Sequence, residues 1–175
     1  YCYCTKSSHF RHIVEEALRN DIHLETSSAF DMPMIDALEK KGSLTKDITV
    51  ICNGFKTFQY KQYIIDMLHD GFKNIIPVLD NKEEFNIYDD ELDIPCSIGM
   101  RIAAEEQPDS QFYTSRLGIR MEDIIEFYNH KIAPNPNFKV KLLHFFINSG
   151  ISDTPYYWNE LEKYTILYCK FKKIN

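Results

Sequence analysis

The sequence predicts an α/β fold built on a parallel sheet. Six strand-like runs each precede an amphipathic helix, and short connections join them. Parallel strands need helical crossovers to return the chain, so this alternation favours a parallel sheet. Two closures fit the pattern, an open doubly wound sheet or a (β/α)8 TIM-type barrel. A barrel needs about 250 residues, so a chain of 175 residues would supply a partial barrel of six strand-helix units.

The first two units lie before residue 43. Residues 1–6 form a β-type run, and the helix after it has Ser7 or Ser8 as its candidate N-cap. Its inward face takes the apolar residues at helical spacing, which are Phe10, Ile13, Val14, Ala17 and Leu18. The second strand covers 22–25, and its helix starts at Asp31 with Pro33 in the first turn.

Four more units follow with the same order of elements. The predicted strands are 47–52, 74–80, 96–103 and 140–147. Pro77 disfavours the centre of the fourth strand, because proline cannot donate to a sheet ladder. Asn81 and Glu84, three residues apart, resemble a capping box for the helix after that strand. Thr154 can cap the last helix, with Pro155 at its first position.

Composition excludes several classes of partner. The net charge of -6 and the scattered basic residues do not suit nucleic acid, and no apolar run approaches the roughly 20 residues that cross a bilayer. The five cysteines lie mostly in apolar runs, which favours a reducing, cytoplasmic setting. No common dinucleotide, P-loop or zinc motif is present, and Cys2 and Cys4 are poorly spaced for zinc, so we expect no metal site in the chain itself.

Polar side chains stand where the predicted strands end. In either closure, function collects at the carboxyl ends of parallel strands. A cation, two acids, an amide, a guanidinium and an imidazole would therefore meet at one rim. The positions are Lys6, Glu25, Asn53, Asp80, Arg101 and the stretch from His144 to Ser149.

Each of these residues has a structural interpretation beside a functional one. Lys6 is either a solvated strand-end lysine or, near the positive end of a helix, an amine able to form a Schiff base. Glu25 suits a helix cap as well as a site. Arg101 lies in an apolar strand and must find an acid, a phosphate or a ring, which favours function. His144 fits a core position as well as a catalytic one, and Ser149 belongs to INSGI, a possible phosphate cradle.

Asp80 and Asn81 are more readily interpreted as caps of the helix that follows the fourth strand. Further upstream, the chain opens in a strand without Met, which indicates a piece cut from a longer protein.

Several of these segments together resemble one family. YCYCTKSSHF resembles the strand ending in Tyr-x-x-Lys-x-Asn of pyridoxal-phosphate (PLP) decarboxylases of the alanine-racemase-like fold type, with Ser7 and Ser8 in place of the small residue and Asn. HLETSSAFD, VICNGFK, PVLDNKEE, MRIAAEE with TSRLG, and LHFFINSG resemble later strand ends of the same family. The likeness spans the whole chain and is greatest to the biosynthetic arginine decarboxylases.

The resemblance implies a role for each rim residue. Lys6 would hold PLP as a Schiff base, with Glu25 near both and Arg101 near the ring. Ser149 matches a serine that contacts the cofactor phosphate. Phe146 falls where the family has a histidine stacked on the ring, and an aromatic face can still stack there. His144, two residues earlier, matches another histidine of the arginine enzymes.

The implied activity is decarboxylation of arginine to agmatine, a step of polyamine biosynthesis. The resemblance also implies a β-rich second domain, the rest of the barrel and a glycine-rich phosphate clamp outside residues 1–175, a homo-oligomer and possible use of Mg²⁺. We expect the 175 residues alone to be inactive. Three alternatives stay open: a non-catalytic PLP-binding barrel, a related decarboxylase or racemase, and a scaffold domain with a merely solvated rim.

Overall fold

The computed structural model describes residues 1–103, 117–146 and 154–175. Six strands form one sheet in the order β1-β2-β3-β4-β5-β6, and every neighbouring pair is parallel. The strands are β1 (Cys2–Cys4), β2 (His23–Thr26), β3 (Thr49–Cys52), β4 (Asn74–Leu79), β5 (Cys96–Arg101) and β6 (Phe138–His144).

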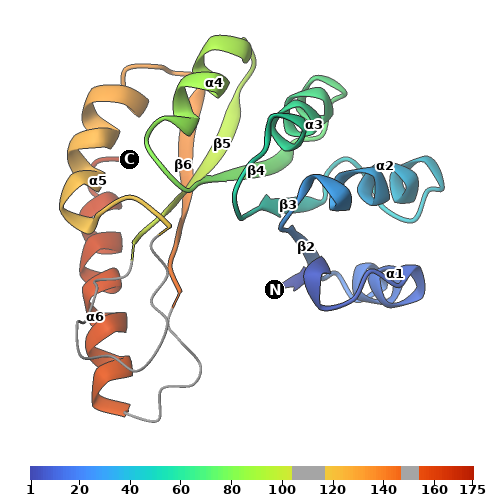
Figure 1. Cartoon of the computed structure of the whole chain (residues 1–175), viewed down its shortest axis with the longest axis horizontal. Helices are drawn as coiled ribbons and strands as arrows, with labels where there is room; N and C mark the ends of the chain where they lie inside the picture. The colour runs from blue at the N-terminus through green and yellow to red at the C-terminus, as the bar shows by residue number, and fades with distance from the viewer. Residues whose placement is uncertain (104–116, 147–153) are drawn as a thin grey trace.

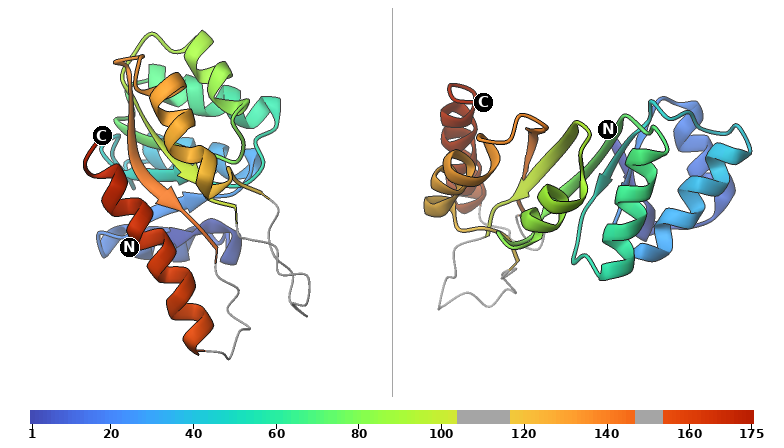
Figure 2. Two further views of the ribbon diagram at one scale, coloured as in Figure 1. Left: turned by 90° about the vertical axis from the view of Figure 1, so that its left-hand side faces the viewer. Right: turned by 90° about the horizontal axis from the view of Figure 1, so that it is seen from above.

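A helix follows each strand. The α-helices are α1 (Arg11–Arg19), α2 (Met32–Lys40), α3 (Phe58–His69), α4 (Glu84–Glu91), α5 (Met121–Phe127) and α6 (Thr154–Phe171). Short 3-10 turns, η1 (Thr5–Ser7) and η2 (Ala29–Asp31), precede α1 and α2, and a π-helical turn, η3 (Tyr128–Ile132), extends α5. Figures 1 and 2 show the helices following one another around the outside of the curved sheet.

The strand order decides between the two predicted closures. A doubly wound sheet reverses its strand order at a switch point, whereas here each strand adds to the same side of the one before it. Right-handed crossovers that always step in one direction keep their helices on one face and curl the sheet. The chain is therefore a partial (β/α)8 barrel, and the doubly wound alternative is wrong.

The core lies between the sheet and the helices. Leu24 and Val50 point toward the helices and are fully buried, whereas Glu25 and Ile51, the next residue along each strand, face the inner side and are half-buried. Strands β4 and β5 are buried over most of their length, as expected of strands covered on both faces. Pro77 lies within β4, opposite Cys52, so the proline does not end the strand.

Gly99 in β5 leaves space for the side chains of the two neighbouring strands. A Cβ placed there would stand 2.8 Å from Cγ of Leu142 and 3.1 Å from Cγ2 of Val78. Both distances are shorter than ordinary van der Waals contact, so any larger residue at this position would press on the side chains of its neighbours in β4 and β6.

The start of α1 differs from the prediction. The helix begins at Arg11 after Phe10, with no side-chain cap, and Ser8 Oγ accepts only the N–H of Phe10 at 3.3 Å. Residues 8–10, which the prediction placed at the start of the helix, lie instead between η1 and α1. Phe10 is consequently outside α1 and 69% exposed instead of facing inward.

Candidate functional site

The predicted rim is present in the structure as a set of strand ends. The sheet is parallel, so the carboxyl ends of all six strands share one edge. Lys6 lies in η1 after β1, Glu25 in β2, and Arg101 and His144 end β5 and β6. Asn53 and Asp80 directly follow β3 and β4.

The side chain of Asn53 connects the carboxyl ends of strands that lie far apart in the sheet. Its side-chain Nδ2 donates to Oε1 of Glu25 at 3.0 Å and lies 3.1 Å from Nε2 of His144. Three strand spacings of about 4.8 Å would separate β3 from β6 by about 14 Å in a flat sheet. The contact of Asn53 with His144 therefore shows how strongly the sheet curves, and it brings the second, third and sixth strand ends into one group.

Arg101 has the acid that its burial requires. Its Nη1 lies 3.4 Å from Oδ1 of Asp80, and the two side chains are 12% and 1% exposed. The cap expected of Asp80 is wrong, because its carboxylate faces Arg101. Asn81 does cap, since its Oδ1 accepts the N–H of Glu84 at 2.9 Å. The reciprocal half of the expected capping box differs too, because the Glu84 side chain accepts from the N–H of Asp80 at 3.1 Å.

Lys56 is a buried cation that sequence reasoning missed. Its Nζ donates to the carbonyls of Gly54 and Val78 and lies 3.4 Å from Oε2 of Glu84. The side chain of Lys56 is 0% exposed, and burial raises the pKa of Glu84. A lysine held by two carbonyls and a carboxylate has no free access to a ligand, so Lys56 braces the loops after β3 and β4. No periodic pattern marks such a residue.

Lys6, in contrast, is open to solvent. It makes no hydrogen bond or ion pair with a described residue. The η1 turn that carries Lys6 is attached to β2, because the buried Thr5 donates through Oγ1 to the backbone carbonyl of Glu25 at 3.1 Å. The register sets Cys4 beside Glu25. The structure thus presents an accessible amine at the rim, in the turn that follows β1, and β1 is the strand paired with the one that carries Glu25.

A second anchor ties the β1 and β2 loops together. Nε2 of His9 lies 2.6 Å from Oδ1 of the buried Asp31. The other oxygen of Asp31 accepts the backbone N–H groups of Ser27 and Ser28 at 2.8 and 3.0 Å. The sequence offered only the position of Asp31 at a helix start as a signal.

Three buried polar atoms of the rim lack partners. Asn53 Oδ1, Asp80 Oδ2 and His144 Nδ1 have no hydrogen-bond partner in the part of the chain that the structure describes. Leaving such an atom unpaired costs about 1–3 kcal/mol, so the rim offers unmet hydrogen bonds to a ligand. Burial, and then the charge of Arg101, lowers the pKa of His144.

The remaining two predicted residues lie after β6. Phe146 follows the strand and is 45% exposed. Ser149 lies outside the described residues.

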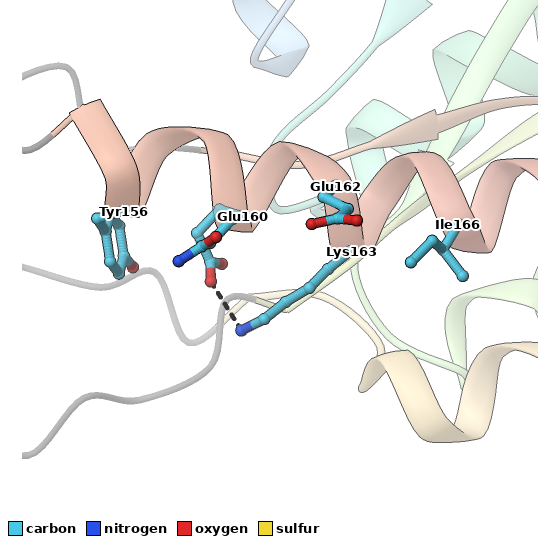
Figure 3. Close-up of a pocket in the computed structure, with 6 residues that line it drawn as sticks. Tyr156, Glu160, Glu162, Lys163 and Ile166 are labelled. Atoms are coloured by element: carbon cyan, nitrogen blue, oxygen red, sulfur yellow. Dashed lines mark hydrogen bonds and ion pairs between the residues drawn. The ribbon is translucent and has the colours of Figure 1, made fainter.

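A separate hollow of about 320 Å³ lies along α6 (Figure 3). The described residues that line it all belong to α6, and among them Lys163 forms an ion pair with Glu160 at 2.8 Å. None of the described rim residues lines it, so we do not assign the candidate site to this hollow.

No group of three or more histidine, cysteine or acidic side chains among the described residues could hold a metal ion. The Mg²⁺ implied by the resemblance therefore has no ligand set there. None of the helices in the described ranges combines the length and apolar character that a membrane crossing requires.

The chain is similar in sequence to a curated protein and, over a larger share of its length, similar in structure to several solved proteins. No protein-family model matches the sequence. A biosynthetic arginine decarboxylase from Rhodopirellula baltica is 24% identical over 149 residues, which are 81% of this chain and 21% of that protein. The chain thus spans about a fifth of the length of its curated relative.

Three solved structures superpose over nearly the whole chain. A mutant of SrLDC in complex with PLP has a TM-score of 0.75 and 16% identity, covering 99% of this chain and 42% of that one. The chain shares the barrel fold of that protein. Lysine decarboxylase from Selenomonas ruminantium (TM-score 0.71, 16% identity, 99% and 42% covered) and diaminopimelate decarboxylase from M. jannaschii with L-lysine (0.71, 18%, 98% and 40%) agree.

The chain therefore corresponds to about 40% of each of these enzymes. The predicted partial barrel is confirmed by these superpositions as well as by the strand order.

Proposed function

We propose that the chain is the cofactor-binding barrel portion of a PLP-dependent amino-acid decarboxylase, with Lys6 as the residue that binds the cofactor aldehyde. The observation that carries the proposal is the placement of Lys6. It is an accessible amine in the turn directly after β1, on the rim of a barrel whose structural relatives include a PLP complex. The rest of the barrel and a second, β-rich domain then lie outside residues 1–175.

The chemistry of the rim fits this cofactor. An aldehyde needs a nucleophilic amine, which Lys6 offers. The anionic and phenolic oxygens of PLP need donors, and the guanidinium of Arg101 and the unpartnered Nδ1 of His144, when it carries the ring proton, would supply them. The exposed ring of Phe146 offers a face for stacking. Ser149 stays our prediction for a contact to the phosphate.

When bound, PLP supplies an electron sink for the bond that breaks at the substrate α-carbon. The protein supplies the arrangement around it. Thr5 fixes the turn of Lys6, so that the amine meets the aldehyde at a set position. Glu25, paired in register with Cys4 two residues before Lys6, provides a carboxylate at the same end of the sheet that can take part in proton transfer. Asp80 orients Arg101.

For the substrate we propose arginine, which would give agmatine and carbon dioxide. The curated relative is an arginine decarboxylase, while the solved structures include lysine and diaminopimelate enzymes. Assays of the intact protein with arginine, ornithine, lysine and diaminopimelate compare these substrates directly. Faster turnover of any of the other three than of arginine would reject this choice.

All five cysteines are free thiols, which suits a reducing compartment, and we propose the cytoplasm as the location. We also propose that the intact enzyme is a homo-oligomer.

Borohydride trapping tests the assignment of Lys6. The intact protein is incubated with PLP, reduced, digested and mapped by mass spectrometry. We expect the cofactor mass on the peptide that contains Lys6, and none in the Lys6→Ala variant. Lys170→Ala, which removes an exposed lysine of α6, is the control and should label fully. Label on any other lysine in the unmodified protein overturns the proposal.

The same preparation separates the alternatives. A non-catalytic PLP-binding barrel would label on Lys6 and release no carbon dioxide from any of the four amino acids. A racemase would label there and invert an amino acid instead. A scaffold domain would take up no PLP at all.

A further inference from the structure

The hydrogen bonds of Asn53 determine how its amide is oriented. The atom 3.0 Å from Glu25 Oε1 must be the NH₂ nitrogen, because an amide oxygen there would face a carboxylate oxygen, and both are acceptors. The same nitrogen lies 3.1 Å from Nε2 of His144. Its two hydrogens therefore go to Glu25 and to His144.

This orientation decides the tautomer of His144. A ring nitrogen that accepts the N–H of Asn53 carries a lone pair and no proton. In the neutral ring the proton then sits on Nδ1. The lowered pKa of His144, caused by burial and by Arg101, agrees with a neutral ring.

The protonated nitrogen is the one without a partner. Nδ1 of His144 is buried and meets no acceptor among the described residues. Arg101 stands beside His144 in the register of β5 and β6, so a donor and a positive charge share the same end of the sheet. An oxygen atom with negative charge complements both.

We propose that Glu25, Asn53 and His144 form a positioning chain in which Asn53 holds His144 as its Nδ1–H tautomer and directs that N–H to an anionic oxygen of the ligand at the rim. Asn53 is the positioning residue, and His144 touches the ligand. The identity of that ligand as PLP or its amino-acid substrate rests on the proposed function. The tautomer itself does not.

The first experiment reads the tautomer without any ligand. Histidine labelled with ¹⁵N in the intact protein shows for each ring which nitrogen carries the proton, and the resonances lost in His144→Asn assign His144. We expect a proton on Nδ1. Asn53→Asp places an acceptor opposite Nε2, so we expect the proton there instead. A proton on Nε2 in the unmodified protein overturns the proposal.

The second experiment identifies the source of the oxygen. PLP alone, and then PLP with arginine, are added to the labelled protein. A shift of Nδ1 with PLP alone assigns the acceptor to the cofactor, and a shift only after arginine assigns it to the substrate carboxylate. No shift of Nδ1 in a protein that binds both overturns the proposed contact. A protein that binds neither leaves the tautomer result standing and removes the proposed function.

A pair of variants gives an independent measure. The amide nitrogen of His144→Asn can take the place of Nδ1, whereas that of His144→Gln lies nearer to Nε2. We expect the dissociation constant of the ligand that shifts Nδ1 to rise less than about threefold for Asn and roughly 10- to 100-fold for Gln, the range for a hydrogen bond to a charged group. His130→Gln, at an exposed position on η3, is the control. Equal losses for Asn and Gln would mean a packing role only.

Discussion

The polar and charged side chains at the rim differ in whether the protein itself provides them with a partner. Lys56 is enclosed by carbonyls and Glu84, while Lys6 is open to solvent. Arg101 faces Asp80, while one nitrogen of His144 stays unpaired. The enclosed groups fix the loops, and the open or unpaired groups are the ones that a ligand can reach.

The titration of His144 should appear in the stability of the protein. Its folded pKa lies below the ordinary value of about 6.5, so the unfolded chain binds the proton more readily. The stability that His144 contributes by staying neutral should therefore be complete above about pH 6.5. Below that pH the free energy of unfolding should fall as the pH drops toward the folded pKa, with a slope of at most about 1.4 kcal/mol per pH unit. His144→Asn should lose this part of the slope in urea titrations at successive pH values.

The exposed His130 is the control for that measurement, because its replacement by Asn should leave the slope as it was. A slope that His144→Asn does not change would show that the ring is as easily protonated in the folded protein as in the unfolded chain.

Removal of the buried cation should be costly. Lys56→Met leaves Glu84 buried without its partner, and such a loss typically costs about 3–5 kcal/mol. The double variant Lys56→Met, Glu84→Leu should recover part of this free energy of unfolding. Lys82→Met breaks an exposed pair with Asp123 and should cost less than about 1 kcal/mol. Equal costs for Lys56→Met and Lys82→Met would contradict the enclosed position of Lys56.

At the scale of elements, the loops after the strands carry the site, and backbone geometry sets their shape. Gly54, in the loop after β3, has φ of +81°, and a Cβ there would stand 2.9 Å from the carbonyl oxygen of Ser27. The loops after β2 and β3 thus approach each other more closely than any side chain allows.

Two glycine variants separate strain from contact. Gly71, after α3, has φ of +92° but nothing within 4 Å of its Cβ position. Gly71→Ala should cost about 1–2 kcal/mol from the left-handed backbone alone. Gly54→Ala adds the clash with Ser27 and should cost about 1–3 kcal/mol more. Thermal unfolding of both variants measures the difference, and equal costs would mean that the two loops can move apart.

Local patterns predicted most of the elements, because strand and helix periodicity depend on neighbouring residues alone. The start of α1 was missed, since the η1 turn depends on Thr5 reaching the carbonyl of Glu25 in the next strand. The rim positions followed from the strand ends. The Asn53 contact to His144 did not, because residues 91 apart in sequence meet only through the curvature of the sheet.

At the scale of the whole molecule, the alternation of strands and helices could not distinguish a barrel from a doubly wound sheet, since both use the same units. The strand order did so. The six strands leave two edges, and β1 and β6 have no further neighbour in the described part of the chain. Exposed strand edges pair readily with other chains.

The 175 residues produced alone should therefore be inactive and prone to associate. We expect no release of carbon dioxide from arginine in the presence of PLP, and a broad, concentration-dependent profile in size-exclusion chromatography. The intact protein, assayed beside it, should turn over arginine. Turnover by residues 1–175 alone would show that the site is complete without the rest of the barrel.

The hydrogen bond between Asn53 and His144 connects the ends of β3 and β6 across the inner side of the curved sheet. Its length depends on how tightly β4 and β5 bend between its two ends. Thermodynamic linkage is reciprocal, so a change that strengthens the hydrogen bond between Asn53 and His144 also stabilises the curved sheet. A change that flattens the sheet weakens this hydrogen bond. Substitutions at Gly99, which touch no ligand, should thus alter affinity at the rim.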